Sequence, residues 1–435
     1  MNLAEVRLWG RTIGAVSQAT DAAHATFQYD PDFARSGIEV APLIMPLARH
    51  PYTFPHLARQ SFHGLPGLLA DSLPDHFGNA LIDAWLAREG RRAADFSAIE
   101  RLCYVGTRGT GALEYRPSIG PAPAQSRKLE VDALADLAGR ILGQREGMHL
   151  LLTSGKEDQA LRDLLRVGTS AGGARAKALI AWNPDSNEVR SGQIEAGSGF
   201  EHWILKFDGV SGSEGTAFSD PAGFGRSEYA YSLMARAAGI AISDCRLFEA
   251  NDRSHFMTRR FDRTAEGHKL HMLSLGAMAH LDFNTAGAHG YEQALLTIRR
   301  LGIGMEAIEE QYRRLLFNVL TRNQGDHVKN IAFLMDPHGR WALAPAFDVN
   351  YAFNPSGDWT RRHQMTVNGK RDGFTLADFE AVARSASMQR GRAAAIHAEV
   401  HGAVSQWREF AEQAGVEGER ATQIRRGLRL ELPKG

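Results

Sequence analysis

The chain has few of the features that mark an exported, membrane-bound or disulfide-linked protein. Only two of its 435 residues are cysteines, Cys103 and Cys245, and they are far apart in no metal-ligand spacing. We expect two buried, reduced thiols in a cytoplasmic protein. No apolar run approaches the roughly 18 residues that a membrane span needs. The first residues include Glu5 and lack the apolar stretch of a signal peptide, so neither export nor membrane insertion is expected.

An excess of charge of either sign is also missing. The chain has 50 Lys+Arg and 50 Asp+Glu, which gives a net charge of zero with histidine neutral. A domain that binds nucleic acid on its own carries a clear basic excess. The balance argues against such a domain, and any contact with DNA is expected mainly through a partner protein.

The composition that remains is that of an ordinary globular protein, 43% hydrophobic and 23% charged. The length predicts two or three packing units. A strand-rich first half is followed by a helix-rich second half, which favours an α+β protein with two lobes. The proline-rich stretch RPSIGPAPAQSRK at 116–128 predicts a boundary between subdomains.

Hydrophobic periodicity and turn residues predict the individual elements. Helices are expected over 75–88, 131–142, 227–238, 291–301, 305–322, 376–385 and 393–414, and strands over 202–208, 244–250, 255–261, 330–335 and 341–344. The last two strands flank Asp-Pro-His-Gly at 336–339, a sequence typical of a tight hairpin turn.

Two glycine-rich stretches could signal a nucleotide. The first, GTSAGGARAK at 168–177, fails the Walker A pattern because Ala174 follows Gly173 and the lysine comes only at Lys177. Such a loop can still hold phosphates through its backbone amides, although a tight turn explains it more simply. The second, at 302–307, lies between two expected helices with no strand before it, so it lacks the context of a dinucleotide site.

Three separate segments offer the parts that phosphoryl transfer from ATP requires. Lys206 falls on an expected strand, and Glu228 lies at the start of the next helix. The segment NQGDHVKN at 323–330, the hairpin and Asp348 then follow, in the order by which kinases bring two metal ligands beneath the phosphates. Each residue alone has a structural explanation, such as an edge-strand lysine or a first-turn acid. Their order together favours a kinase-like site.

These segments also carry a family resemblance. The chain resembles the HipA family of serine/threonine protein kinases, which are the toxins of bacterial HipA–HipB toxin–antitoxin modules. The resemblance covers nearly the whole chain and rests on DSLPDHFGNALIDAWLA (71–87), VGTSAGGARAKALI (167–180), HWILKF (202–207), TRRFDR (258–263), MLSLGAMAH (272–280), NQGDHVKN (323–330) and LAPAFDVNYAFNPSGDW (343–359).

The resemblance implies a two-lobed, protein-kinase-like α+β fold. It implies an N-terminal HipA subdomain over 1–120, a nucleotide-binding N-lobe with the Gly-rich loop over 121–262, and a helical C-lobe with the catalytic loop and metal site over 263–435. It also implies ATP and Mg²⁺ as cofactors, a HipB-like antitoxin as partner, and operator DNA reached through the antitoxin complex. The substrate type is a serine of a cellular protein, within this family an aminoacyl-tRNA synthetase.

The resemblance assigns roles to matching residues. Lys206 corresponds to the ATP lysine with Glu228 as its helix partner, and Asn330 and Asp348 correspond to the Mg²⁺ ligands. Ser170 corresponds to a serine whose autophosphorylation disables ATP binding. The remaining residues expected to contact the nucleotide are Gly172, Gly173 and Lys177 of the Gly-rich loop, Phe256, Met257 and Thr258 near the adenine, and Lys329.

One departure concerns the catalytic aspartate, which the family places two residues before the histidine and five before the metal-binding asparagine. In this chain Gly325 occupies that position, and the neighbouring residue is Asp326. Because this chemistry depends on positioning, three alternatives follow: Asp326 serves as the base, His327 helps, or catalysis is impaired. In the last case the chain is a pseudokinase that acts as a binding module in the antitoxin and operator complex. A small-molecule kinase is a weaker alternative, because the segments match HipA.

Overall fold

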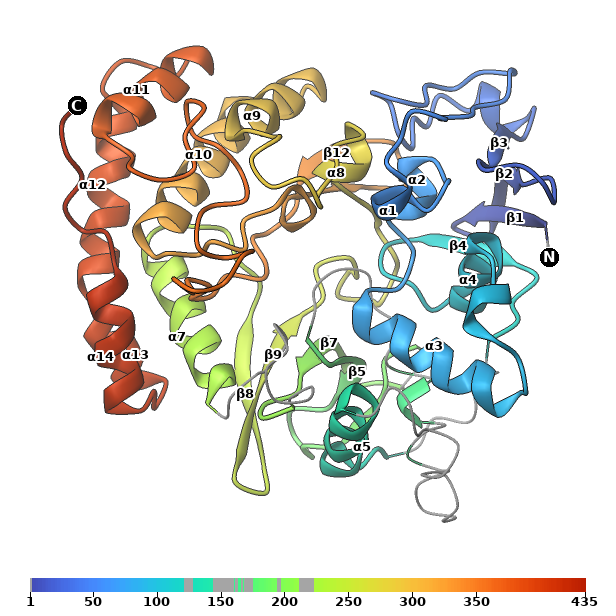
Figure 1. The fold of residues 1–435 in the computed structure, drawn as a ribbon, viewed down its shortest axis with the longest axis horizontal. Helices are drawn as coiled ribbons and strands as arrows, with labels where there is room; N and C mark the ends of the chain where they lie inside the picture. The colour runs from blue at the N-terminus through green and yellow to red at the C-terminus, as the bar shows by residue number, and fades with distance from the viewer. Residues whose placement is uncertain are drawn as a thin grey trace.

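The computed structural model describes residues 2–120, 128–143, 160, 163–165, 167, 175–193, 197–210 and 223–435. Figure 1 shows a strand-rich N-terminal region in blue, a central sheet in green and a helical region from yellow to red. The expected α+β class, with a strand-rich and a helical lobe, is confirmed. Among the helices of these residues, none combines the length and hydrophobicity of a membrane span.

The N-terminal region is built on a four-stranded antiparallel sheet of order β3-β2-β1-β4. In β1, Ala4, Val6 and Leu8 alternate with more exposed residues, so one face of the sheet packs on the core. The elements are β1 (Leu3–Leu8), β2 (Arg11–Ser17), β3 (Thr26–Tyr29), α1 (Arg59–Phe62), α2 (Gly67–Ala70), α3 (His76–Arg88), α4 (Ala98–Val105) and β4 (Leu113–Arg116).

The second region is a five-stranded antiparallel sheet of order β6-β5-β7-β9-β8. Lys206, the last residue of β7, lies between Lys177 of β5 and Phe256 of β9. Phe77 and Leu81 of α3 join the core of this region, which ties it to the N-terminal one. The elements are α5 (Val131–Gly143), β5 (Lys177–Trp182), β6 (Val189–Ser191), β7 (Glu201–Lys206), α7 (Phe224–Ala237), β8 (Cys245–Ala250) and β9 (Arg253–Arg259).

Helix α7 begins earlier than the sequence predicted. The expected start was residue 227, whereas the helix begins at Phe224. The carboxylate of Asp208, just after β7, accepts hydrogen bonds from the backbone amides of Gly223 and Gly225, both at 3.0 Å. This carboxylate satisfies amides that the first turn leaves without helical partners. Local sequence patterns could not predict this cap, because Asp208 is distant in the sequence from the start of the helix.

The third region is mainly helical and carries a small antiparallel sheet of order β10-β11-β12. Helix α7 lies between the five-stranded sheet and the C-terminal helices (Figure 1), where the Tyr231 ring packs on Trp407 of α13 at 5.4 Å. The elements are β10 (His271–Ser274), α8 (Leu275–Met278), α9 (Tyr291–Arg300), α10 (Met305–Leu320), β11 (Ala332–Met335), β12 (Trp341–Leu343), α11 (Leu376–Ser385), α12 (Arg392–Ser405), α13 (Trp407–Gln413) and α14 (Gly418–Gly427).

Two predictions near the C-terminus were incomplete. The single helix expected over 393–414 is two helices, because the backbone leaves the helical region at Gln406 and the buried Trp407 donates from its ring to the carbonyl of Ala421. Helix α14 was not predicted. Ile424 is its one buried residue, so its sequence gives almost no apolar periodicity.

Candidate functional site

A pocket opens between the five-stranded sheet and the helical region. We call it the interlobe pocket. Its lining comes from all three regions of the fold: Asp71, Ser72 and Thr110; Lys177, Ile204, Lys206 and Thr258; and Met272, Ser274, Lys329, Asn330, Phe347 and Asp348. Residues far apart in the sequence therefore meet around one cavity, at the place where the sequence analysis expected a nucleotide.

Lys206 is the centre of the charged cluster in this pocket. Its ammonium group lies 2.5 Å from Oε1 of Glu228 on α7 and 2.6 Å from Oδ1 of Asp348. The second oxygen of Glu228 lies 3.0 Å from the guanidinium of Arg175. Burial lowers the pKa of Lys206, but the carboxylates of Asp348 and Glu228 outweigh burial and raise this pKa above its usual value. Lys206 is therefore held as a cation.

Asp348 and Asn330, the two expected metal ligands, are brought together. Nδ2 of Asn330 lies 3.4 Å from Oδ2 of Asp348 and donates to the carbonyl of Gly325 at 3.0 Å. Burial raises the pKa of Asp348, but Lys206, Lys177 and Arg175 together hold it well below its usual range. Asp348 has a φ of 56°, a left-handed conformation that is uncommon outside glycine and often found at functional sites.

These two side chains fit a magnesium ion by the chemistry of their donors. A carboxylate and an amide oxygen are hard ligands of the kind that Mg²⁺ takes, and Mg²⁺ is usually held by one or two carboxylates together with phosphates. No group of three or more His, Cys, Asp or Glu side chains suited to a metal occurs in the described part of the chain. A metal here would share its coordination with a ligand.

Two further lysines of the pocket contact acidic residues of the N-terminal region. Lys177 lies 2.9 Å from Oδ2 of Asp75, with both side chains buried, and Lys329 lies 3.9 Å from Oδ1 of Asp71. The sequence analysis expected both lysines at the nucleotide and did not assign either aspartate to the site. The segment DSLPD at 71–75 did stand out as a family segment, but nothing in it indicated partners so distant in sequence.

Strand β9 presents its residues to opposite sides. Thr258 lines the interlobe pocket, and the ring of Phe256 lies 5.6 Å from the ammonium group of Lys206. Met257, between them, packs its side chain into the core of the sheet region instead. Of the three residues expected near the adenine, two therefore have side chains on the pocket face. This is the alternation that a strand imposes.

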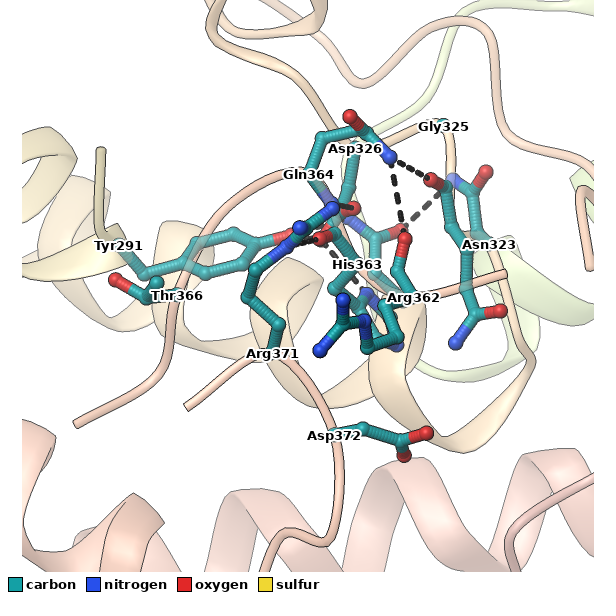
Figure 2. A network of polar contacts seen from close by, with 12 residues as sticks. Tyr291, Asn323, Gly325, Asp326, Arg362, His363, Gln364, Thr366, Arg371 and Asp372 are labelled. Carbon is teal, nitrogen blue, oxygen red and sulfur yellow. Dashed lines mark hydrogen bonds and ion pairs between the residues drawn. The ribbon is translucent and has the colours of Figure 1, made fainter. Parts of the chain in front are cut away.

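Asp326 belongs to the loop at 323–330, the expected catalytic loop, but its side chain does not line the interlobe pocket. The Asp326 side chain is 1% exposed, and its carboxylate accepts hydrogen bonds of 2.8 Å from the Tyr291 hydroxyl, His363 Nδ1 and the Gln364 backbone amide. Figure 2 shows these donors converging on it. Asp326 is absent from the lining of the interlobe pocket. It lines a second cavity together with His327 and Asn330, and its hydrogen bonds are to the three donors above and not to Lys206, Glu228 or Asp348.

Gly325 and His327, the residues on either side of Asp326, are less buried than Asp326 itself. A Cβ atom placed on Gly325 would meet only the Cβ of Ala352, at an ordinary 3.8 Å, and Gly325 has no left-handed backbone that would require glycine. His327 is half-buried, and burial lowers its pKa. Its Nδ1 has no hydrogen-bond partner among the described residues. Ser170, Gly172 and Gly173, the remaining expected residues, lie outside the described ranges.

Comparison with known proteins agrees with the arrangement of these regions. A family model described as the HipA-like C-terminal domain matches residues 169–407, and another described as the HipA N-terminal domain matches residues 4–116. The first match alone spans more than half of the sequence. The chain belongs to the HipA family, as the sequence resemblance indicated.

A solved structure shows a similar fold. The chain is similar to one in the Shewanella oneidensis MR-1 toxin–antitoxin complex of HipA, HipB and operator DNA, with a TM-score of 0.68, 16% identity, and coverage of 97% of this chain and 96% of that chain. The match to the Helicobacter pylori proinflammatory kinase CtkA has a TM-score of 0.34 and 14% identity, and covers 58% of this chain and 93% of that one. That likeness is too weak to carry an argument. No curated protein sequence matches the chain.

Proposed function

We propose that this chain is the toxin of a HipA-type toxin–antitoxin module and that it binds ATP with Mg²⁺ in the interlobe pocket. One observation carries the proposal. Lys206, Glu228, Asn330 and Asp348 come from separate segments, and they form one connected cluster beside a pocket. A structural lysine would need one acidic partner, whereas Lys206 contacts two, one of which is next to an amide.

Each residue has a role in this proposal. Lys206 holds the phosphates, and Glu228 orients Lys206 from α7. Asn330 and Asp348 supply oxygens to Mg²⁺, which when bound neutralises charge on the phosphates. Lys329 adds positive charge from the catalytic loop, and Thr258 faces the base from β9. The Gly-rich loop with Ser170 would cover the phosphates, and phosphorylation of Ser170 would place about −1.5 to −2 charges there.

The reaction we propose is transfer of the γ-phosphate to a serine of a cellular protein, with an aminoacyl-tRNA synthetase as the family-type target. Gly325 offers no carboxylate to orient the acceptor hydroxyl, and Asp326 is turned into the protein. We therefore expect slow transfer in the natural chain, although Lys206, Glu228, Asn330 and Asp348 of the proposed nucleotide site are in place.

The lack of a carboxylate at Gly325 and the burial of Asp326 also favour a second function. If transfer is absent, the chain acts as a binding module that docks a HipB-like antitoxin on operator DNA. Its net charge of zero agrees with DNA contact through that partner. The two functions share the nucleotide site and differ only in turnover.

Calorimetry of ATP binding with Mg²⁺ and with EDTA tests the nucleotide site. We expect the natural chain to bind more tightly with Mg²⁺ and Asp348→Asn to lose this gain, because the ion loses an anionic ligand. Asp336→Asn is the matched control, since Asp336 lies in the hairpin turn paired with Arg340. An unchanged gain in Asp348→Asn would overturn the placement.

Intact-mass analysis after incubation with Mg²⁺ and ATP separates the two functions. Added phosphate, mapped to Ser170 or to a supplied protein, supports the kinase. Nucleotide binding without any added phosphate supports the binding module.

A further inference from the structure

We propose that Asp326 is a positioning residue, which fixes the catalytic loop so that Asn330 turns its side-chain oxygen toward Mg²⁺. This inference rests on the proposed function and extends it to a group outside the pocket. Asp326 would thus act without contacting the nucleotide, the metal or the acceptor.

The carboxylate of Asp326 is held from two helices and a distant loop. The Tyr291 hydroxyl, at the start of α9, donates to Oδ2 and itself accepts a 2.9 Å hydrogen bond from Asn318 of α10. The Gln364 amide donates to Oδ1. Hydrogen bonds to a buried, charged acceptor are the strong ones, and a carboxylate with this many donors has little freedom to move.

His363 extends this network to the C-terminal segment. Nη1 of Arg429 lies 3.0 Å from Nε2 of His363. Arginine can only donate, so Nε2 accepts and the ring hydrogen lies on Nδ1, which donates to Asp326. Arg429 is itself fixed by its backbone amide, which donates to the carbonyl of Leu320 at 2.8 Å. The segment after α14 therefore supports the Asp326 side chain from behind.

On the pocket side, the preceding residue in the chain, Gly325, transmits this rigidity. The carbonyl of Gly325 accepts hydrogen bonds from Nδ2 of Asn330 at 3.0 Å and from the backbone amide of His327 at 2.9 Å. Nδ2 of Asn330 also approaches Asp348. Because both contacts use the amide nitrogen, the oxygen is the atom left for a hard cation. Fixing residue 326 thus fixes which end of the Asn330 amide faces the metal.

Asp326→Asn tests this role at nearly constant volume. An amide has one acceptor oxygen where the carboxylate has two, so the three donors cannot all be satisfied. We expect the Mg²⁺-dependent gain in ATP affinity to fall about 10-fold or more, as when an outer partner of a metal ligand is removed. ATP affinity in EDTA should not change.

Asp378→Asn is the matched control. The Asp378 side chain is 3% exposed and accepts hydrogen bonds from Asn368, Lys370 and Thr375 at the start of α11. Its loss should lower the melting temperature and leave the Mg²⁺-dependent gain intact. Tyr291→Phe is the milder second variant: it removes one donor to Asp326 and should reduce the gain in the same direction.

The outcomes separate the two proposals. If Asp326→Asn melts earlier, like the control, but keeps the full Mg²⁺-dependent gain, the positioning role is overturned and the proposed function stands. If Asp326→Asn does not fold, an unchanged gain in Tyr291→Phe overturns the role instead. If the natural chain gains no ATP affinity from Mg²⁺, the proposed function fails, and the positioning role fails with it.

Discussion

The catalytic loop and the segment after the hairpin each carry an aspartate, and the two aspartates have opposite surroundings. Asp348 is 29% exposed, lines the interlobe pocket and contacts the cation Lys206. Asp326 is 1% exposed and gives both oxygens to donors of the protein itself. A partly exposed carboxylate in a pocket is available to a ligand, whereas a buried carboxylate whose oxygens both accept from the protein is used by the fold.

This difference indicates the roles of Gly325 and Asp326 in the catalytic loop. From the sequence alone, Asp326 could have been a displaced catalytic base. Its partners are Tyr291, His363 and Gln364. The expected catalytic position is therefore Gly325, whose carbonyl accepts a hydrogen bond from the pocket residue Asn330. Mutations at residues 325 and 326 test this assignment, because a change at 325 should alter phosphate transfer and a change at 326 should alter stability.

The largest expected effect is a gain of function in Gly325→Asp. The backbone there accepts a side chain, since a Cβ meets only Ala352 at 3.8 Å. General-base assistance is worth about 10² to 10⁴ in rate. We expect phosphate transfer, measured by intact mass over time, to rise by about this factor. ATP affinity should stay the same.

Gly325→Asn is the control for this gain. It has nearly the same shape as aspartate and no basic carboxylate. An equal rise in both variants would show that a side chain at 325 merely orders the loop. A natural chain that already transfers phosphate quickly, and loses this activity in Asp326→Ala, would reverse our assignment of the two positions.

The sequence predicted those parts of the site that depend on chain order. Local periodicity placed Lys206 on a strand and Glu228 on the following helix. The order of kinase parts and the family resemblance then singled out these two residues with Asn330 and Asp348. These four residues meet in the structure. The side on which Met257 points also follows from alternation once the strand is known.

Other features depend on partners that no local pattern reveals. His363 and Gln364 follow Asp326 by 37 and 38 residues, so the burial of that carboxylate could not be inferred from NQGDHVKN. The Asp75 contact with Lys177 and the capping of α7 by Asp208 are of the same kind. In each case the tertiary structure brings a charge to a partner that is distant in the sequence.

The second prediction compares the two aspartates by stability, without nucleotide. Asp326→Ala leaves several buried donors without an acceptor, and we expect it to lower the free energy of unfolding by about 3 kcal/mol. Asp348→Ala removes a partly exposed ion pair, and Lys206 keeps Glu228, so a loss of at most about 1 kcal/mol is expected. Urea unfolding at pH 7 with a common slope measures both. Equal losses would contradict the distinction drawn here.

The last prediction concerns a buried histidine that forms no ion pair within the described part of the chain. His271 is fully buried in β10, and its Nε2 donates to the carbonyl of Val40 at 2.9 Å. Burial lowers its pKa to about 4, against the opposing influence of the Val40 hydrogen bond and Asp71. Since the ordinary value is about 6.5, the unfolded chain binds more protons between these pH values. The stability due to neutral His271 is therefore complete above about pH 6.5 and falls as the pH falls toward 4.

Lowering the pH from 7 to 5 should reduce the free energy of unfolding by about 2 kcal/mol through this histidine. Asp348, whose pKa lies well below its usual range, should stay anionic at pH 5. Urea unfolding of the natural chain and of His271→Gln at pH 7 and pH 5 measures the difference. The variant should lose less stability than the natural chain between the two pH values. Parallel losses would mean that His271 does not titrate in this range, and that burial without an ion pair shifts its pKa less than argued.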